Sequence, residues 1–453
     1  MPQFNIFNLG LFLVSLFLIG CSQDISNKKD IGRDIGLAGS KDILKQEIFL
    51  DVELGELNIS GQQKMDFISM RDSNVLLFDS GAFSINSASL DGHAISEWTS
   101  SKGETRFVLP KDLIKGGRHR LVLSYEASPK RGFGSRPELL YTGYFACDWM
   151  VCDQNAFDDR FKLDIQLAVK KGLTSIGPGT QLTSQAFATE KDLHSWTTPS
   201  AYPAYVFAFA VGNIEFEDVS GSCDAKLRVA RPAGTPEIGH LFSDTCKMLE
   251  FFENKSSVVF PFDQYVQLYV PESGAAQEAV SHSILGSHVI DPMQDMPSED
   301  WAIAHELAHQ WWGNRTTAAD LQNFWLNEAI VTFMVASWKE TRWGSENYDH
   351  EIGLAKARWD RAVKDWKDVP IAHAGEFPSL GHRRAIQYSK GAVFLDQLRH
   401  DLGEEAFWQG MSNFTQTHWG KSVRTVDFQR SMEQASGRTL QTLFDSWVYD
   451  ATE

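Results

Sequence analysis

The sequence predicts an α+β fold in which a β-rich region precedes a mainly helical one. Before residue 216, several runs stay apolar or alternate with polar residues, are rich in β-branched and aromatic side chains, and end at turn residues. These runs are EIFLDVEL, NVLLFDS, FSINSASLDG, TRFVLP, HRLVLSYEA, FKLDIQLAV and YVFAFAVGNIEF. From about Lys226 the apolar residues adopt helical spacing, interrupted by the strand-like LRVARP and QLYVPE. We predict an antiparallel β domain over residues 45–215 and a mainly α-helical domain with a small mixed sheet over 216–453.

Composition narrows the class of protein. The chain has 453 residues, of which 43% are hydrophobic and 12% aromatic, enough for large cores. Its formal charge is -17 and its pI is about 5.2. A nucleic-acid-binding protein needs a clustered basic face, and the sequence has no such cluster, so we expect no nucleic-acid partner.

The first residues resemble an export signal. MPQFNIFNLGLFLVSLFLIG ends at Cys21, and its apolar core from Leu9 to Ile19 is too short for a mature spanning helix. Leu18–Cys21 resembles a bacterial lipobox, whose cysteine is acylated, although no Lys or Arg precedes the apolar core. We expect a signal over residues 1–21, a lipid on Cys21, a flexible polar tether over 22–44 and a place in the bacterial cell envelope. The alternative is an uncleaved N-terminal anchor, which also implies export and membrane attachment.

The remaining cysteines suit an exported protein. Cys147, Cys152, Cys223 and Cys246 permit two disulfides with three connectivities. We favour the close pairs, Cys147 with Cys152 and Cys223 with Cys246. A second zinc site is less favoured because no histidine accompanies these cysteines at finger spacing.

The segment from Ala304 to Phe333, AHELAHQWWGNRTTAADLQNFWLNEAIVTF, carries the strongest chemical signal. His305 and His309 are four residues apart and share one face of a helix, with Glu306 beside them as a base for a bound water. We expect this helix to begin near Ser298, which is a plausible N-cap.

Glu328 completes the metal site. It lies on a second amphipathic pattern, with Leu326, Ile330, Phe333 and Met334 at helical spacing. Two histidines and one carboxylate leave the fourth tetrahedral position open, as a catalytic zinc ion requires. We therefore predict one Zn²⁺ held by His305, His309 and Glu328. The alternative is a surface helix with solvated side chains.

HELAHQWWGN followed by WLNEA resembles the gluzincin aminopeptidases, the group that includes aminopeptidase N and leukotriene hydrolase. SAYPAYVFAFAVGNIE resembles part of the saddle-shaped N-terminal β domain of that family. The resemblance covers most of the chain and implies that the second domain is a thermolysin-like catalytic domain. It also leads us to expect a short form that ends with the catalytic domain, without the family's later β module and C-terminal helical domain.

Two further residues gain roles from this resemblance. Tyr388-Ser389-Lys390-Gly391 matches the family's catalytic tyrosine, and a phenol can donate a hydrogen bond to an oxyanion at neutral pH. Glu278, in SGAAQEAV, aligns with the family's amine-binding carboxylate, with Gln277 as the competing alignment. A carboxylate that receives the substrate ammonium selects peptide ends. The family's upstream Gln or Glu has no counterpart in LLYTGYFA.

These features predict a zinc aminopeptidase with peptide substrates, in which Glu306 is the general base and Tyr388 the oxyanion donor. One alternative is a zinc endopeptidase with the same chemistry. Another is a non-catalytic surface-binding lipoprotein. The sequence does not indicate an oligomeric state.

Overall fold

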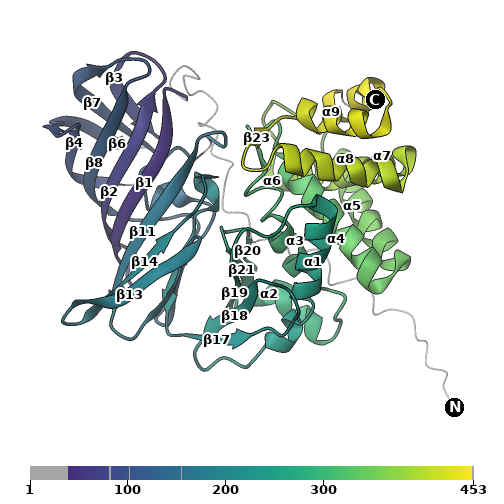
Figure 1. Cartoon of the computed structure of the whole chain (residues 1–453), viewed down its shortest axis with the longest axis horizontal. Coiled ribbons are helices and arrows are strands. Elements are labelled where there is room, and N and C mark those ends of the chain that lie inside the picture. Colours follow the sequence, from purple (N-terminus) through teal and green to yellow (C-terminus); the bar gives the residue numbers. More distant parts are fainter. Residues whose placement is uncertain (1–38, 81–82, 102, 155, 451–453) are drawn as a thin grey trace.

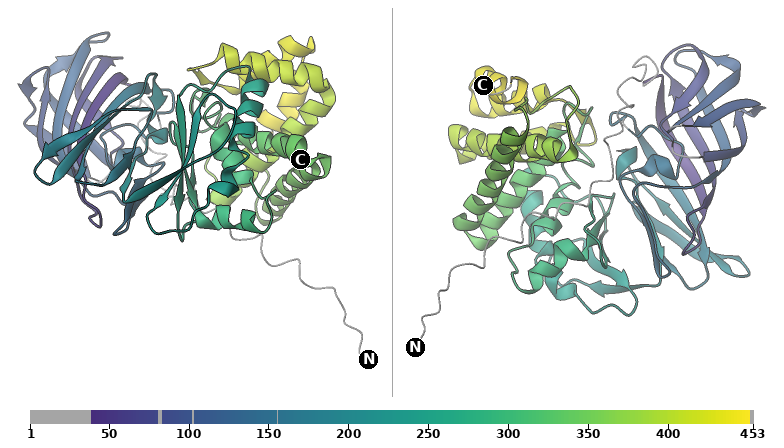
Figure 2. Two further views of the ribbon diagram at one scale, coloured as in Figure 1. Left: turned by 60° about the horizontal axis from the view of Figure 1, so that its bottom comes forward. Right: turned by 180° about the vertical axis from the view of Figure 1, so that it is seen from behind.

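The computed structural model describes residues 39–80, 83–101, 103–154 and 156–450. A β domain built from the first part of the chain lies beside a helical domain built from the last part, with a smaller sheet between them (Figure 1). The views in Figure 2 show the same order of layers from two other sides. The predicted signal, the predicted acylation site Cys21 and most of the predicted tether lie outside the described residues.

The β domain is dominated by a sheet with the strand order β13-β14-β11-β1-β2-β8-β4-β5, to which β15 is added through β11. Two smaller sheets, β12-β16-β10-β9 and β3-β7-β6, complete the domain. Apolar side chains alternate inward along the long strands, so that Leu50, Phe67 and Leu121 are buried. The strands are β1 (Lys41–Asp51), β2 (Ile59–Ser69), β3 (Ser73–Phe78), β4 (Phe83–Leu90), β5 (His93–Ala94), β6 (Glu97–Ser101), β7 (Glu104–Leu113), β8 (Arg118–Ala127), β9 (Phe133–Ser135), β10 (Leu139–Thr142), β11 (Arg160–Lys170), β12 (Thr174–Ile176), β13 (Thr180–Ala188), β14 (Lys191–Thr197), β15 (Tyr202–Pro203) and β16 (Ala210–Gly212).

The prediction of a purely antiparallel β domain is wrong at one central pair. β1 runs parallel to β11, with Ile48 opposite Ile165, whereas β1 and β2 are antiparallel. More than a hundred residues separate β1 from β11 in the chain, and periodicity within each strand does not encode the direction of a partner that distant. β1 also begins at Lys41, inside the segment predicted as tether.

The sheet of the second domain is mixed. Its order is β17-β18-β19-β21-β20, where β18, β19 and β21 are parallel and both edge strands are antiparallel to their neighbours. The strands are β17 (Ile214–Asp218), β18 (Lys226–Pro232), β19 (Gln264–Val270), β20 (Ala276–Gln277) and β21 (His282–Gly286). Since β17 begins at Ile214, the predicted domain boundary after residue 215 falls inside a strand of the second domain.

The helices pack on the side of this sheet that faces away from the β domain (Figures 1 and 2). They are α1 (Thr245–Ser256), α2 (Ser287–Ile290), α3 (Trp301–Ala308), α4 (Trp325–Trp343), α5 (Ser345–Asp365), α6 (Leu380–Arg384), α7 (Gly391–Leu402), α8 (Glu404–Thr417), α9 (Thr425–Ser436) and α10 (Gln441–Phe444), with a short parallel ladder of β22 (Thr317–Ala318) and β23 (Ser422–Val423). π-helical turns η6 (Ala385–Lys390) and η7 (Asp445–Tyr449) precede α7 and follow α10. Short 3₁₀ turns are η2 (Ala146–Asp148), η3 (Ala204–Val206), η4 (Gly239–Phe242) and η5 (Asp291–Gln294).

Both favoured cysteine pairings are confirmed. Disulfides join Cys147 to Cys152 and Cys223 to Cys246. The first lies buried in the β domain, and the second ties the loop after β17 to α1. Within the described part of the chain, no helix is long and apolar enough to cross a membrane.

Candidate metal centre

Helix α3 carries both candidate histidine ligands. It begins at Trp301 with Asp300 as its N-cap residue, so the prediction of Ser298 in that position is wrong. Asp300 is fixed by Trp338 and Trp343, whose indole N–H groups donate to its Oδ2 at 2.8 and 3.1 Å. That anchor is formed by the far end of α4 and could not be seen in the local sequence around α3.

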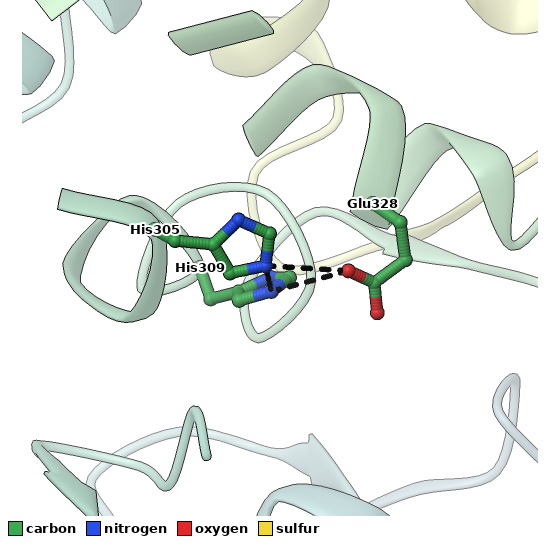
Figure 3. A group of neighbouring side chains, drawn as sticks. All are labelled: His305, His309 and Glu328. Atoms are coloured by element: carbon green, nitrogen blue, oxygen red, sulfur yellow. Dashed lines mark hydrogen bonds and ion pairs between the residues drawn. The ribbon is translucent and has the colours of Figure 1, made fainter. Parts of the chain in front are cut away.

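Glu328 closes a small triangle with the two histidines (Figure 3). The Nε2 atoms of His305 and His309 lie 3.2 Å apart, and each lies 3.5 Å from Glu328 Oε2. Glu328 comes from the first turn of α4, the second helix that the sequence predicts. His309 and Glu328 are almost completely buried, whereas His305 is slightly exposed toward solvent.

The triangle has the dimensions of a zinc chelate. A tetrahedral zinc ion with ligands at about 2.0–2.1 Å holds its ligand atoms about 3.3–3.4 Å apart, close to the three observed separations. Glu328 Oε2 is buried, and it lies 3.5 Å from the two histidine Nε2 atoms without a well-formed hydrogen bond. A metal ion between the three atoms would satisfy this buried oxygen, so the donor set fits a metal ion.

The electrostatics of the site also favour a cation. Burial alone would lower the pKa of His309, but the carboxylates of Glu328, Glu278 and Glu306 raise it to about 10. Burial raises the pKa of Glu306 well above its ordinary value, and neighbouring Glu278 and Glu328 add to that effect. In this arrangement a proton on His309 supplies the positive charge beside Glu328, and a divalent metal ion that displaced this proton would supply it instead.

The loop after α3 holds His309 in the orientation that chelation needs. His309 Nδ1 lies 2.9 Å from the carbonyl oxygen of Trp312, which leaves Nε2 free to face the other ligands. Gly313 follows with φ +128°, and a Cβ there would lie 2.7 Å from His309 Nδ1. Only glycine accommodates both this backbone conformation and this close approach.

Glu278 lies beside the general-base candidate. Glu278, Glu306 and His309 each offer one ligand-type atom, and these atoms lie within 4.8 Å of one another. Glu278 is almost fully buried directly after the two-residue edge strand β20, and burial raises its pKa to about 7. Gln277, the competing alignment, instead accepts a hydrogen bond from Tyr144 N at 3.0 Å and donates to Glu278 Oε2 at 2.5 Å.

Two side chains after His309 hold the Glu278 segment against α3. Asn314 Nδ2 donates to the carbonyl oxygen of Glu278 at 3.1 Å. Gln310 accepts from Ser281 N at 3.1 Å and donates to Ala279 O at 2.9 Å. The sequence interpretation assigned no role to Gln310 or Asn314. Their only local signal is that they are amides in the metal-motif segment HQWWGN, and their partners are distant in the chain.

Tyr388 faces the metal triangle from the π-helical turn η6. Its ring is stacked nearly parallel to that of His305, with an interplanar angle of 3° and a centroid separation of 6.4 Å. A π-turn inserts one extra residue into a helix and often occurs at functional sites. The sequence interpretation identified Tyr388 but did not predict this turn.

Here a β domain precedes a helix with the motif His-Glu-x-x-His, and a glutamate of the next long helix lies beside the two histidines. This is the arrangement of the gluzincin class. Residues 241–447 match the model of the peptidase family M1 domain. The chain is 24% identical over 440 residues to aminopeptidase 2 of Candida albicans, which covers 89% of this chain and 46% of the relative. The chain thus spans about half the length of the curated relatives it matches.

Solved structures resemble the whole described fold. A two-domain M1 zinc metallopeptidase with bound L-tryptophan superposes with a TM-score of 0.76 at 21% identity, covering 91% of this chain and 95% of that one. An M1 zinc metallopeptidase from Deinococcus radiodurans, bound to a Tyr-Ser-Ala substrate, gives a TM-score of 0.75 at 20% identity, with 91% and 95% coverage. Residues 241–447 therefore match the peptidase family M1 domain, and the described chain shares its fold with two-domain M1 zinc metallopeptidases, in agreement with the resemblance seen in its motifs.

Proposed function

We propose that the protein is a zinc-dependent aminopeptidase that removes N-terminal residues from peptides. His305, His309 and Glu328 would hold the zinc ion, and the observation that carries the proposal is their triangle of 3.2–3.5 Å. A zinc ion in this position supplies Lewis acidity toward a carbonyl group and lowers the pKa of a bound water toward about 7.

Glu306 is proposed as the general base. It directly follows His305 in the chain, and its side chain is buried. Its Oε2 has no hydrogen-bond partner among the described residues, so it is able to take a proton from water. As the carbon–nitrogen bond breaks, the same carboxyl group gives the proton to the leaving amine nitrogen. Tyr388, stacked against His305, is proposed to donate its hydroxyl hydrogen to the developing oxyanion.

Glu278 is proposed to select the free N-terminus of the substrate. Its carboxylate lies within 4.8 Å of the ligand-type atoms of Glu306 and His309, and it is buried. A substrate ammonium can form a charge-assisted hydrogen bond there, next to the base that acts on the first peptide bond. A blocked N-terminus has no positive charge to offset these clustered carboxylates, so it should bind poorly.

The test is a comparison of two peptides that differ only in acetylation of the N-terminus, using the zinc-loaded protein and Glu306→Gln. Faster cleavage of the free peptide at its first bond, lost in Glu306→Gln, is the expected result. Equal cleavage of both peptides would favour an endopeptidase with the same chemistry. A protein that neither retains zinc nor cleaves either peptide would be a binding module.

The proposed location is the bacterial cell envelope, through a lipid on Cys21. The support is the sequence of the first 21 residues, because the described residues begin at 39. Metabolic labelling with a clickable fatty acid tests the proposal. Label and membrane association should both be lost in Cys21→Ala, whereas persistence of the label in that variant would contradict lipid attachment at this residue.

A further inference from the structure

Tyr205 brings the β domain into contact with the metal centre. It lies in the turn η3, between β15 and β16, and its side chain is buried. Its hydroxyl donates to the carbonyl oxygen of Gly313 at 2.9 Å and accepts a hydrogen bond from Asn327 Nδ2 at 3.0 Å. These partners belong to the loop after α3 and to the first turn of α4, so a single hydroxyl bridges the two segments that supply the ligands.

Each partner of Tyr205 is adjacent in the chain either to a proposed ligand or to a residue that contacts one. Gly313 follows Trp312, whose carbonyl oxygen contacts His309 Nδ1. Asn327 precedes Glu328, and its Oδ1 also accepts from the backbone N–H of Ala318 at 2.8 Å. Movement of the Tyr205 hydroxyl would therefore be transmitted to both sides of the ligand triangle.

The aromatic ring of Tyr205 is held from several sides by other aromatic rings. Phe157 packs edge-on at a centroid separation of 5.2 Å, Tyr144 lies at 5.3 Å and Phe324 at 6.2 Å. Because Phe157 and Tyr144 also belong to the β domain, that domain fixes the position of the ring. Such aromatic packing removes rotational freedom that a surface tyrosine would keep.

We propose that Tyr205 is a positioning residue for the metal site, through which the β domain keeps His309 and Glu328 at chelating distance. This inference rests on the proposed zinc site, and it assigns Tyr205 no contact with substrate or with the metal. Partners that orient metal ligands typically change metal affinity by about 10- to 100-fold when removed. The β domain is then a part of the metal centre, in addition to its place beside the catalytic domain.

The experiment measures zinc release from the full-length zinc-loaded protein. Excess chelator is added to the wild type, Tyr205→Phe and Tyr125→Phe, and released zinc is followed with a colorimetric indicator. Tyr125 is the matched control, because it is buried in the same domain and its hydroxyl donates one hydrogen bond, to Trp149 O at 2.9 Å, away from the ligands. We expect release to be about 10- to 100-fold faster in Tyr205→Phe and unchanged in Tyr125→Phe.

The partner residue provides the second arm. Asn327→Ala should also accelerate zinc release. The double variant Tyr205→Phe/Asn327→Ala should show a smaller effect than the two single effects combined, because both changes remove the same bridge. Wild-type release from Tyr205→Phe, or equal acceleration in Tyr125→Phe, would overturn the inference and leave the proposed function standing. Absence of tightly bound zinc in the wild type would overturn the proposed zinc site and this inference together.

Discussion

The three proposed metal ligands and the two residues proposed to face the substrate are carried by different kinds of backbone. His305 and Glu328 lie within regular α-helices and His309 closes the end of one, so helical hydrogen bonds fix their spacing. Glu278 follows an edge strand of only two residues, and Tyr388 lies in a π-helical turn. Helix geometry therefore sets the position of each proposed ligand along its own helix, and Tyr205 bridges the two segments, whereas Glu278 and Tyr388 depend on side-chain anchors for their own placement.

Those anchors are specific. Asn314 and Gln310 hold the Glu278 segment, as described above. The turn around Tyr388 is held by Gln387, which donates to Leu321 O at 2.8 Å, and by Lys390, which donates to Asp368 Oδ2 and Val369 O, both at 2.9 Å. We expect changes on this substrate-facing side to alter turnover while the protein keeps its zinc.

The largest expected effect is that of Glu306→Gln. This change removes the base but none of the proposed ligands, so kcat should fall on the order of a thousandfold or more. Zinc content, measured by atomic absorption, should remain at the wild-type level. His309→Ala is the contrasting variant and should lose both zinc and activity. A Glu306→Gln protein without zinc would show that Glu306 is needed to bind the metal. Residues needed for zinc binding and residues needed only for turnover could then not be separated at this position.

Tyr388→Phe should have the next largest effect. Loss of the hydroxyl removes a donor to the developing oxyanion, so kcat should fall by about a hundredfold or more, with little change in KM or zinc content. Tyr449→Phe is a suitable control, since Tyr449 also lies in a π-turn but is partly exposed. Steady-state kinetics on a free-ended peptide measure the effect. Wild-type kcat in Tyr388→Phe would exclude the oxyanion role.

Glu278→Gln tests amine recognition. Loss of a charge-assisted hydrogen bond of about 1.5–3 kcal/mol should lower kcat/KM for free-ended peptides by about ten- to hundredfold. Cleavage of the acetylated peptide should change little, so the preference for free ends should shrink. Glu272→Gln, at an exposed glutamate side chain with 89% relative accessibility, is the control. An unchanged preference would assign amine binding to another residue.

The sequence placed His305, His309 and Glu328 on two helices because the signal for each helix is local. The i, i+4 histidines and the apolar spacing around Glu328 define these helices, and the spacing of residues along a single helix needs no distant partner. The parallel pairing of β1 with β11 and the role of Tyr205 were not predicted. Each depends on groups more than a hundred residues away in the chain, and the pattern around Tyr205 in SAYPAYVFAFA is that of an ordinary buried strand.

The N-terminus of α3 was placed too early for a related reason. Ser298 and Glu299 are locally good helix starters, but Asp300 takes the N-cap position, where two tryptophans at the far end of α4 hold its side chain. The π-turn at Tyr388 is likewise stabilised by Asp368 and Leu321, which precede it by 20 residues or more.

The smallest predicted effect, that of Lys390→Met, addresses the anchors directly. Lys390 is fully buried and methionine keeps its length without its charge, while Asp368 retains a hydrogen bond from Trp359 Nε1 at 3.1 Å. We expect kcat to fall by about tenfold through a small displacement of Tyr388, with KM and zinc content unchanged. Gln387 still holds the turn, which is why the effect should be smaller than that of Tyr388→Phe.

A double-mutant cycle separates this positioning role from general destabilisation. If Lys390 acts through Tyr388, Lys390→Met should have almost no further effect on kcat in a Tyr388→Phe protein. Lys339→Met is the matched control, because Lys339 is also buried and is paired at 2.5 Å with Glu351 of α5, outside η6. An equal loss of kcat in both lysine variants would contradict this positioning role. So would simple addition of the effects of Lys390→Met and Tyr388→Phe. In either case the turn would be held in place by its own backbone.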